Sequence, residues 1–233
     1  MSPLLGVRRI DELLSRLPDG VDWLGDQERA RLARLQHPQR RAQFLAGHFY
    51  ARMLLARYSG EDARCWTLER DAHGAPVALR GGDANGLQIS LSHSGGWVAC
   101  VVAEMPIGVD IECPGRERDV LHLARSLYPP EFVDALTRSS IEDRRRQFYV
   151  RWTLDEAFAK ADGRGIRLRE LAMQAWRPAP RDAADGWGWV LSEGFLAVAV
   201  QRPQPPLEFT ADGEVPTEAV AWQREIYSIS RIE

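Results

Sequence analysis

Two short patterns recur in the same order about one hundred residues apart, and this repeat constrains the fold more than any other feature of the sequence. The run at 40–44 (RRAQF) matches 144–148 (RRRQF), and 96–102 (GWVACVV) is echoed by 194–200 (GFLAVAV). Two matches in one order at nearly one offset indicate two related halves, each a helix packed on a small sheet. The alternative is chance, because short apolar patterns recur freely. If the halves are related, the cleft between them is the natural ligand site.

Helical and strand patterns follow one another along the chain, so the predicted fold class is α/β (α+β), with two similar halves related by pseudo-twofold symmetry. The expected helices cover 26–58, with a break near Pro38, 119–139 and 141–162. The expected strands cover 87–92, 97–103, 107–112, 187–191 and 195–201. We expect an N-terminal half over 1–105, a C-terminal half over 106–205 and an extension over 206–233 that wraps back over the body.

Composition excludes several classes of protein. The chain has 233 residues, of which 45% are hydrophobic and 27% charged, as expected for a globular protein with a full core. A net charge of −3 argues against a general nucleic-acid binder. We find neither a run of about 18 apolar residues nor a signal-peptide core, and three cysteines without metal spacing do not suggest a disulfide framework. These features predict a cytoplasmic protein, which we expect to be a monomer.

Lysine is almost absent from the chain. Of its 30 basic residues, all except Lys160 are arginine, a bias that points to codon pressure in the genome. A lysine kept against that bias indicates a position that needs a compact ammonium group rather than the planar fork of arginine. The alternative is that the position of Lys160 is accidental.

A pair of carboxylates stands at the end of an apolar strand, in the run Gly108-Val109-Asp110-Ile111-Glu112. Because strand side chains alternate, Asp110 and Glu112 face the same side while Ile111 points into the core. Two carboxylates held so close repel each other unless a cation lies between them, and an all-oxygen set suits Mg²⁺. The alternative is a merely solvated pair.

Further polar residues stand on a predicted helix and in a predicted turn. Trp152, Glu156 and Lys160 are spaced by four and therefore share one helix face. In one interpretation Trp152 belongs to the core and Glu156 forms a surface pair with Lys160. In the other, Glu156 supplies a third oxygen to the metal and Lys160 contacts a phosphate. In the turn, Ser92 and His93 have the hydroxyl, imidazole and backbone N–H groups that bind phosphate, although a turn histidine is also often solvated or capping. A Ser–His hydrolase is disfavoured because the sequence has no nucleophile elbow.

Taken together, these segments resemble the ordered signature of the 4′-phosphopantetheinyl transferase superfamily. That signature runs Ser-His-Ser, Gly-[Ile/Val]-Asp-x-Glu and Trp-x-x-Lys-Glu-[Ala/Ser]-x-x-Lys, and it is matched here by 92–94, 108–112 and 152–160. The chain length is similar to that of the two-halved, surfactin-synthetase-activating branch. The final lysine of the signature falls on Lys160.

The resemblance implies a function for each matching position. It implies Mg²⁺ ligands at Asp110, Glu112 and Glu156, catalytic roles for Glu156 and Lys160, and coenzyme A contacts from Ser92, His93, Lys160, Gly74, Pro76 and either Arg40 or Arg41. The implied reaction moves 4′-phosphopantetheine from coenzyme A to a serine of an apo acyl or peptidyl carrier protein and releases 3′,5′-ADP. An acidic helix of the carrier would contact arginines at 116, 118, 125, 138 and 144–146. The alternative is that these arginines only form a solvated surface.

Two positions depart from the family pattern. Asp155 and Ala75 replace lysines of the signature, which would weaken coenzyme A binding unless Asp155 points away or arginines such as Arg31 or Arg164 compensate. Asp155 is turned by about 100° from Glu156 on the helix, so we expect it to face solvent. One alternative is therefore an inactive homologue that binds coenzyme A or a carrier. Another Mg²⁺-dependent phosphotransferase is disfavoured because no P-loop or kinase signature is present.

Overall fold

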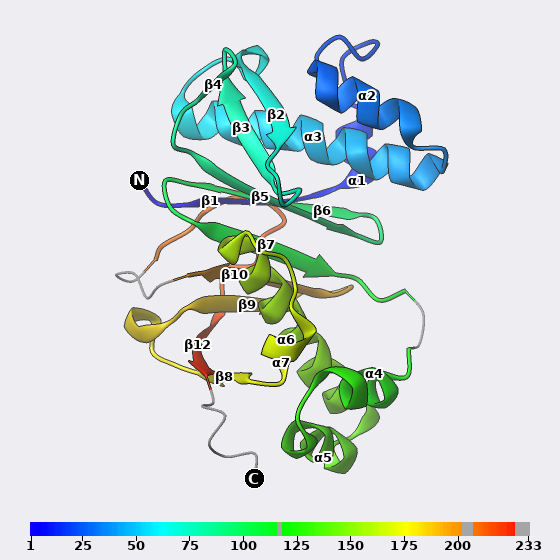
Figure 1. Cartoon of the computed structure of the whole chain (residues 1–233), viewed down its shortest axis with the longest axis vertical. Coiled ribbons are helices and arrows are strands. Elements are labelled where there is room, and N and C mark those ends of the chain that lie inside the picture. Colours follow the sequence, from blue (N-terminus) through cyan, green and yellow to red (C-terminus); the bar gives the residue numbers. More distant parts are fainter. Residues whose placement is uncertain (116–117, 202–206, 227–233) are drawn as a thin grey trace.

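The structure is a computed structural model that describes residues 1–115, 118–201 and 207–226. Its main body has four layers, in which one long helix, two sheets and a second long helix follow one another (Figure 1). The helix α3 (Pro38–Ser59) covers the outer face of the first sheet, and α6 (Ile141–Asp162) covers part of the second. The inner faces of the two sheets pack against each other through a shared apolar core. No helix within the described ranges combines the length and apolarity needed to cross a membrane.

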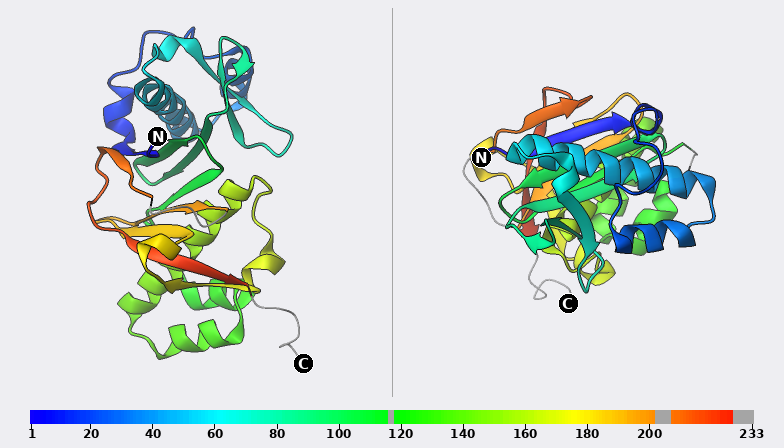
Figure 2. Two further views of the ribbon diagram at one scale, coloured as in Figure 1. Left: turned by 90° about the vertical axis from the view of Figure 1, so that its left-hand side faces the viewer. Right: turned by 90° about the horizontal axis from the view of Figure 1, so that it is seen from above.

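The first half contains the first sheet and a small three-stranded sheet. The remaining elements of this half are β1 (Leu4–Arg9), α1 (Ile10–Leu14), α2 (Asp26–Arg34), η1 (Ala63–Cys65), β2 (Trp66–Arg70), β3 (Pro76–Arg80), β4 (Asp83–Ala84), β5 (Gln88–Ser94) and β6 (Trp97–Ala103). The strand order is β11-β1-β6-β5 in the first sheet and β2-β3-β4 in the small one. Seen from above, α3 lies across the first sheet (Figure 2).

The second half contains a five-stranded sheet with the order β7-β10-β9-β12-β8. Its elements besides α6 are β7 (Ile107–Glu112), α4 (Val120–Leu127), α5 (Pro130–Arg138), α7 (Leu168–Leu171), β8 (Gln174–Pro178), η2 (Arg181–Ala183), β9 (Gly186–Val190), β10 (Phe195–Val200), β11 (Thr210–Gly213) and β12 (Val220–Ile226). Of these, β11 belongs to the first sheet.

The connectivity repeats between the halves. In the first half a strand (β1), a 22-residue helix (α3) and the hairpin β5–β6 follow in order, and β6 returns to pair antiparallel with β1. In the second half β7, the 22-residue α6 and the hairpin β9–β10 follow, and β10 returns to pair antiparallel with β7. The paired ends correspond, with Leu4 opposite Val102 and Ile107 opposite Val200. The predicted α/β class with two similar halves is confirmed.

One predicted helix is wrong. The residues 119–139 form two helices, α4 and α5, separated at Tyr128-Pro129-Pro130. Proline has no backbone N–H and restricts the residue before it to extended conformations, so consecutive prolines end one helix, and the second proline begins the next. The break predicted near Pro38 is present, because Pro38 is the first residue of α3.

The residues after 206 contribute a strand to each large sheet. β11 pairs in parallel with β1, while β12 lies between β9 and β8. In β11, the carboxylate of Asp212 accepts hydrogen bonds from Tyr50 Oη (2.8 Å) and Arg8 Nε (3.1 Å), and it also pairs with Arg57. The division into two halves and an extension stays a prediction, but the described part of the extension is built into both sheets.

Close packing of α6 on β7 depends on Gly108. A Cβ atom at this position would lie 1.9 Å from the carbonyl oxygen of Ala157 in α6. No such contact is possible without moving the helix away from the strand, and both elements carry candidate site residues.

We therefore expect Gly108→Ala to destabilise the protein. Overpacking a rigid core costs about 1–3 kcal/mol, and the obstructing atom here belongs to a helix backbone. Urea unfolding followed by circular dichroism measures the change. Gly47→Ala in α3 is the control, because a Cβ there meets nothing within 4 Å. An unchanged midpoint for Gly108→Ala would show that the helix–strand contact is not tight.

Candidate functional site

The strands β5 and β7 lie at the boundary between the halves, where they are joined by side chains. Every second residue at this end of β5 is a serine whose hydroxyl bonds to β7. These bonds join Ser90 Oγ to Val109 N (3.1 Å), Ser92 Oγ to Asp110 Oδ1 (2.7 Å) and Ser94 Oγ to Glu112 Oε2 (3.3 Å). The predicted alternation therefore holds, and both carboxylates of β7 turn toward the neighbouring half.

The helix α6 brings its polar face against this pair of carboxylates. Trp152 Nε1 donates to Glu112 Oε1 at 3.1 Å, and Lys160 Nζ donates to Asp110 Oδ1 at 2.7 Å and to the carbonyl oxygen of Val109 at 3.0 Å. The hydrogen bond and the charge pair fix two of the three helix residues predicted from their spacing. Lys160 therefore contacts β7 rather than forming only a surface pair with Glu156. Trp152 bonds to Glu112 and also packs against a core cluster of the second half.

The carboxylates at this site perturb one another. Burial, followed by the charge of Asp110, raises the pKa of Glu156 to about 7, although Lys160 opposes the shift. Burial and Asp110 also raise the pKa of Glu112. Asp110 is itself 5% exposed, and its Oδ2 is buried without a hydrogen-bond partner. A cluster of negative charge with an unpaired buried oxygen has the chemistry of a cation site.

The three carboxylates are not preassembled as one ligand set. Within the described ranges, no three His, Cys, Asp or Glu side chains are arranged to hold a metal ion. Lys160 instead places its ammonium on Asp110 Oδ1 and compensates that charge. The assignment of Asp110, Glu112 and Glu156 as ligands of one ion stays a prediction.

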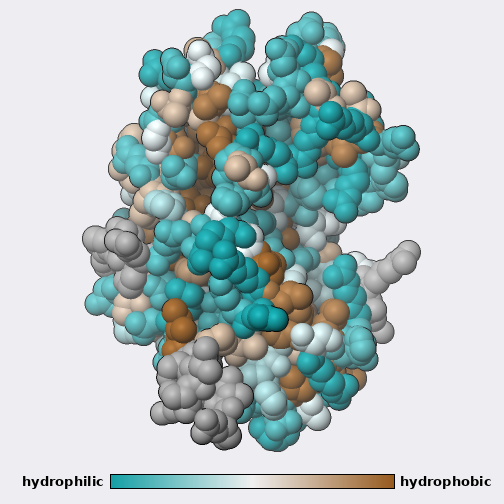
Figure 3. Space-filling model, viewed as in Figure 1, coloured by the Kyte–Doolittle hydropathy of each residue, from teal (hydrophilic) through white to brown (hydrophobic). Residues whose placement is uncertain are grey.

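A cavity of about 500 Å³ opens beside these residues, among α2, α3, β2, β3 and β5. Figure 3 shows the surface notched at the top of the molecule, between α2 and the small sheet. Four arginines line the cavity: Arg31, Arg34, Arg40 and Arg70. Arg31 also lies over the ring of Phe44, 5.5 Å from its centroid. This cavity combines an aromatic wall with several cations, which suits a polyanionic nucleotide.

Ser92 and His93 connect the cavity to the carboxylates. Both line the cavity, and the hydroxyl of Ser92 bonds to Asp110. Desolvation, followed by the charges of Lys160, Arg40 and Arg31, lowers the pKa of His93, whose side chain keeps an exposed surface. A neutral His93 among these cations can still donate one hydrogen bond to a phosphate oxygen.

The structure separates the two arginine candidates. Arg41 Nη1 donates to the carbonyl oxygens of Leu32 (2.7 Å) and Leu35 (3.2 Å), so it caps the end of α2 and does not line the cavity. Arg40 does line the cavity. The structure therefore favours Arg40 over Arg41 as the nucleotide contact. Arg34 and Arg70 were missed, since a lone arginine near a helix end or in a strand carries no distinctive sequence signal.

The loop 74–76 belongs to a tight turn that begins at Asp71. Gly74 has φ of +86°, and the carboxylate of Asp71 accepts hydrogen bonds from the backbone N–H groups of His73 and Ala75, both at 2.9 Å. Pro76 lines the cavity. Of the candidate positions Gly74 and Pro76, only Pro76 is among the lining residues, and the cavity arginines supply cations in the absence of a lysine at 75.

Asp155 does not face solvent, so that expectation is wrong. Its side chain is 1% exposed and accepts hydrogen bonds from Tyr128 Oη (2.9 Å), Gln174 Nε2 (2.8 Å) and Trp176 Nε1 (2.8 Å). Burial raises its pKa to about 6, while the nearby charge of Arg151 opposes the shift. Asp155 is thus a structural residue inside the second half and is turned away from the cavity.

A buried carboxylate joins the two helices, α2 and α3, that form one wall of the cavity. Glu28 is 3% exposed, and its Oε1 bonds to Arg52 Nη1 (2.9 Å) and His48 Nδ1 (2.5 Å), while Oε2 accepts from the backbone N–H of Gly25 (2.8 Å). These bonds tie α2 to α3. Burial alone would raise the pKa of Glu28, but the bonds from His48 and Arg52 lower it from 4.5 to about 2.

The comparisons with known proteins agree with this geometry. A family model described as the 4′-phosphopantetheinyl transferase superfamily matches residues 106–187, which contain β7 and α6. The 4′-phosphopantetheinyl transferase HetI of Nostoc sp. strain PCC 7120 is 30% identical over 182 residues, covering 76% of this chain and 77% of HetI. The chain belongs to this superfamily.

Two further known proteins are similar to the chain. The 4′-phosphopantetheinyl transferase Sfp of Bacillus subtilis is 26% identical over 150 residues, which make up 64% of each chain. A solved holo-(acyl-carrier-protein) synthase of Bacillus anthracis covers 43% of this chain and 92% of its own, with 18% identity and a TM-score of 0.37. The family predicted from the motifs is confirmed: the chain is an enzyme that transfers a phosphopantetheine group.

We expect Glu28→Gln to destabilise the enzyme at neutral pH and to have little effect in acid. The native pKa of about 2 lies below the ordinary value of 4.5, so the carboxylate contributes stability above pH 4.5 and loses it as the pH falls toward 2. At pH 7 the substitution leaves Arg52 without its partner, at a cost of roughly 3 kcal/mol. Urea unfolding at a series of pH values measures the difference. A deficit that stays constant down to pH 2 would contradict the assignment.

Proposed function

We propose that the enzyme transfers 4′-phosphopantetheine from coenzyme A to a serine of an apo acyl or peptidyl carrier protein, with Mg²⁺, and releases 3′,5′-ADP. The observation that carries the proposal is the continuity of two features. The arginine-lined cavity shares Ser92 with the cluster formed by Asp110, Glu112, Glu156 and Lys160. A nucleotide held in the cavity would therefore extend its diphosphate toward those carboxylates and the ammonium.

Coenzyme A would bind on both sides of Ser92, with its nucleotide in the arginine-lined cavity and its diphosphate beside the carboxylates. The arginines at 31, 34, 40 and 70 would hold the nucleotide phosphates, with Pro76 in the wall of the cavity and Gly74 in the loop that precedes it. His93 would donate to a phosphate oxygen. Lys160 donates a hydrogen bond to Asp110 within the cluster. From there its ammonium would stabilise charge on the reacting phosphoryl group.

Asp110, Glu112 and Glu156 would hold the Mg²⁺ ion, which when bound neutralises the diphosphate. The unpaired Oδ2 of Asp110 and the mutually raised pKa values of Glu112 and Glu156 fit this assignment. Trp152 and Ser94 fix the orientation of Glu112. Glu156 would take the proton of the carrier serine, because a carboxylate held at the reacting centre can act as a general base.

The carrier would dock beside α4 and α5, where exposed arginines lie on the second half. Arg118, Arg125, Arg138 and Arg146 are exposed there. Arg144 and Arg145 instead donate to backbone carbonyls, and position 116 lies outside the described residues. An acidic helix of the carrier would complement the four exposed guanidinium groups. We assign the enzyme to the cytoplasm, as a monomer.

Glu156→Gln tests the reaction and the metal site together. The change keeps the size of the side chain but removes the charge and the base, so we expect transfer to fall at least a hundredfold. Mass spectrometry of an apo carrier incubated with coenzyme A and Mg²⁺ should detect one added phosphopantetheine with the wild-type enzyme and little with the variant. Urea unfolding should show that the variant is folded. An inactive coenzyme A-binding homologue would give no mass gain even with the wild type.

Lys160→Arg tests the need for an ammonium group. Although the change conserves charge, the wider guanidinium cannot occupy the position between Asp110 and the carbonyl of Val109, and a displacement of about 1 Å at a reacting centre can cost a hundredfold in rate. We expect a loss of that size, and at least as large a loss for Lys160→Ala. Arg167→Lys, at an exposed ion pair, is the matched control. Steady-state kinetics measure the loss of activity. A lower kcat indicates that Lys160 acts on the transition state, whereas a higher KM alone indicates that it only binds coenzyme A. An unchanged rate would mean that the position of Lys160 is accidental.

A further inference from the structure

A larger cavity, of about 830 Å³, lies on the opposite side of α6 from the transfer site. Its wall on this helix includes Val150 and Leu154, whereas Trp152 and Glu156 belong to the face turned toward β7. Residues two apart on a helix point about 160° away from each other. One helix therefore separates the two sites, and the second cavity is independent of the proposed coenzyme A cavity.

The groove exists because of an alternating sequence in β9, Gly186-Trp187-Gly188-Trp189-Val190. Both tryptophans pack into the core between the two sheets. The glycines face the other way, and a Cβ on Gly186 would lie 2.9 Å from the ring of Trp176, while one on Gly188 would lie 3.2 Å from Trp222 Nε1. Because these glycines have no side chains, the indole rings of Trp176 and Trp222 pack directly on β9. This close packing leaves a hollow beside α6.

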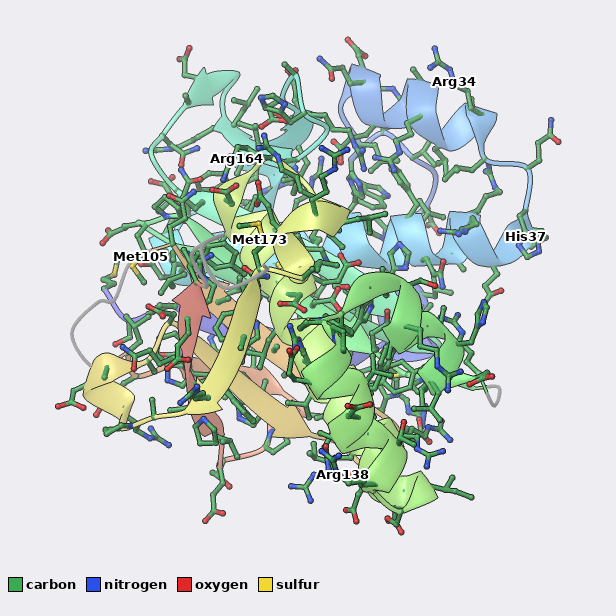
Figure 4. All side chains as sticks on the ribbon, turned by 60° about the horizontal axis from the view of Figure 1, so that its bottom comes forward. Arg34, His37, Met105, Arg138, Arg164 and Met173 are labelled. Carbon is green, nitrogen blue, oxygen red and sulfur yellow. The ribbon has the colours of Figure 1, made fainter. Side chains whose placement is uncertain are left out.

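The walls of the groove are mostly apolar. They are formed by Phe132 of α5, Val150 and Leu154 of α6, Trp176 of β8 and Trp222 of β12. Val190 and Val220 keep 53% and 48% of their surface exposed at its rim. Figure 4 shows this side of the molecule, with α6 beside the strands of the second sheet and Met173 where the chain enters β8. Walls made mainly of hydrophobic and aromatic side chains are typical of small-molecule sites.

A buried guanidinium group lies in the wall of the groove. Arg151 is 7% exposed, and its Nη2 donates to the carbonyl oxygens of Leu171 (3.1 Å) and Gln174 (2.5 Å), while its Nε is buried without a hydrogen-bond partner. Its nearest carboxylate, Asp155, is 3.8 Å away and is itself bonded to three other donors. The guanidinium also lies over the rings of Tyr128 and Phe132, 4.2 Å and 4.4 Å from their centroids, so Arg151 contributes a positive charge to the wall of the groove.

Among the other charged groups that line the groove, the guanidinium of Arg146 supplies a positive charge at one end. Arg146 is exposed and makes no ion pair within the part of the chain that the structure describes, whereas Arg177 pairs with Glu225 at 2.8 Å. The carboxylates of Glu131 and Asp143 also line the groove, but each lies in the first turn of a helix. Free N–H groups and the helix dipole stabilise negative charge at that position.

We propose that this groove binds an amphipathic carboxylate, with an aliphatic chain over Phe132, Trp176 and Trp222 and the carboxylate toward Arg146 and Arg151. The volume lies within the range of about 300–1,000 Å³ typical of small-molecule sites. An apolar chain matches the walls, and a single anionic head group matches the guanidinium groups. The ligand binds behind α6 and leaves the proposed nucleotide cavity free.

Isothermal titration calorimetry on the full chain with octanoate, decanoate and dodecanoate, below their micelle-forming concentrations, tests the proposal. We expect saturable binding that tightens by about tenfold for each two methylene groups added. Ala135→Trp fills the groove from α5 and should weaken decanoate binding at least tenfold, while Thr137→Trp, outside the lining of the same helix, should not. Circular dichroism verifies that both variants are folded.

The head group is tested separately. Arg146→Gln should weaken decanoate binding by about threefold and leave decanol binding unchanged, whereas Arg138→Gln, an exposed arginine outside the groove, should alter neither. Coenzyme A should not displace decanoate. The proposal is overturned if decanoate does not bind, if Ala135→Trp binds it normally, if decanol binds as tightly as decanoate, or if coenzyme A competes. The last outcome would place the carboxylate in the arginine-lined cavity, and none of these outcomes bears on transfer activity.

Discussion

The hydrogen bond between Ser92 Oγ and Asp110 Oδ1 joins the two halves at the point where the candidate chemistry is located. The same oxygen also accepts from Lys160 on α6, so a strand from each half and a helix meet on one carboxylate. A buried carboxylate with two donors on one oxygen and none on the other is held in place yet not fully satisfied. The position of every other site residue follows from the packing that brings these three elements together.

Residue patterns predicted this meeting point well because they are local. Period-two alternation placed Asp110 and Glu112 on one face of β7, and a spacing of four placed Trp152 and Lys160 on one face of α6. The repeat then predicted that two helix-and-sheet units would share a boundary. These inferences need only the geometry of a strand and of a helix, together with one long-range relation.

The errors concern what a side chain meets across space. Arg41 and Arg40 are neighbours in sequence, yet one caps a helix and the other lines a cavity, and only the path of α2 decides between them. Asp155 was expected in solvent because helix geometry gives its direction but not its neighbours, and three donors from α4's end and β8 bury it. The groove behind α6 was not predicted either, although the alternating glycines and tryptophans of β9 contain its signal once the sheet is known.

The parallel pairing of β11 with β1 has a consequence for how the chain acquires its structure during synthesis. Strand β1 is made first, but one of its edges stays open until Thr210–Gly213 have left the ribosome, since these residues supply its parallel neighbour. Tyr50, Arg8 and Arg57 likewise have no Asp212 to bind until then. Contacts between such distant residues form slowly, and an unpaired strand edge is prone to association with other chains. The first sheet therefore keeps one edge of β1 open for association until β11 has been made.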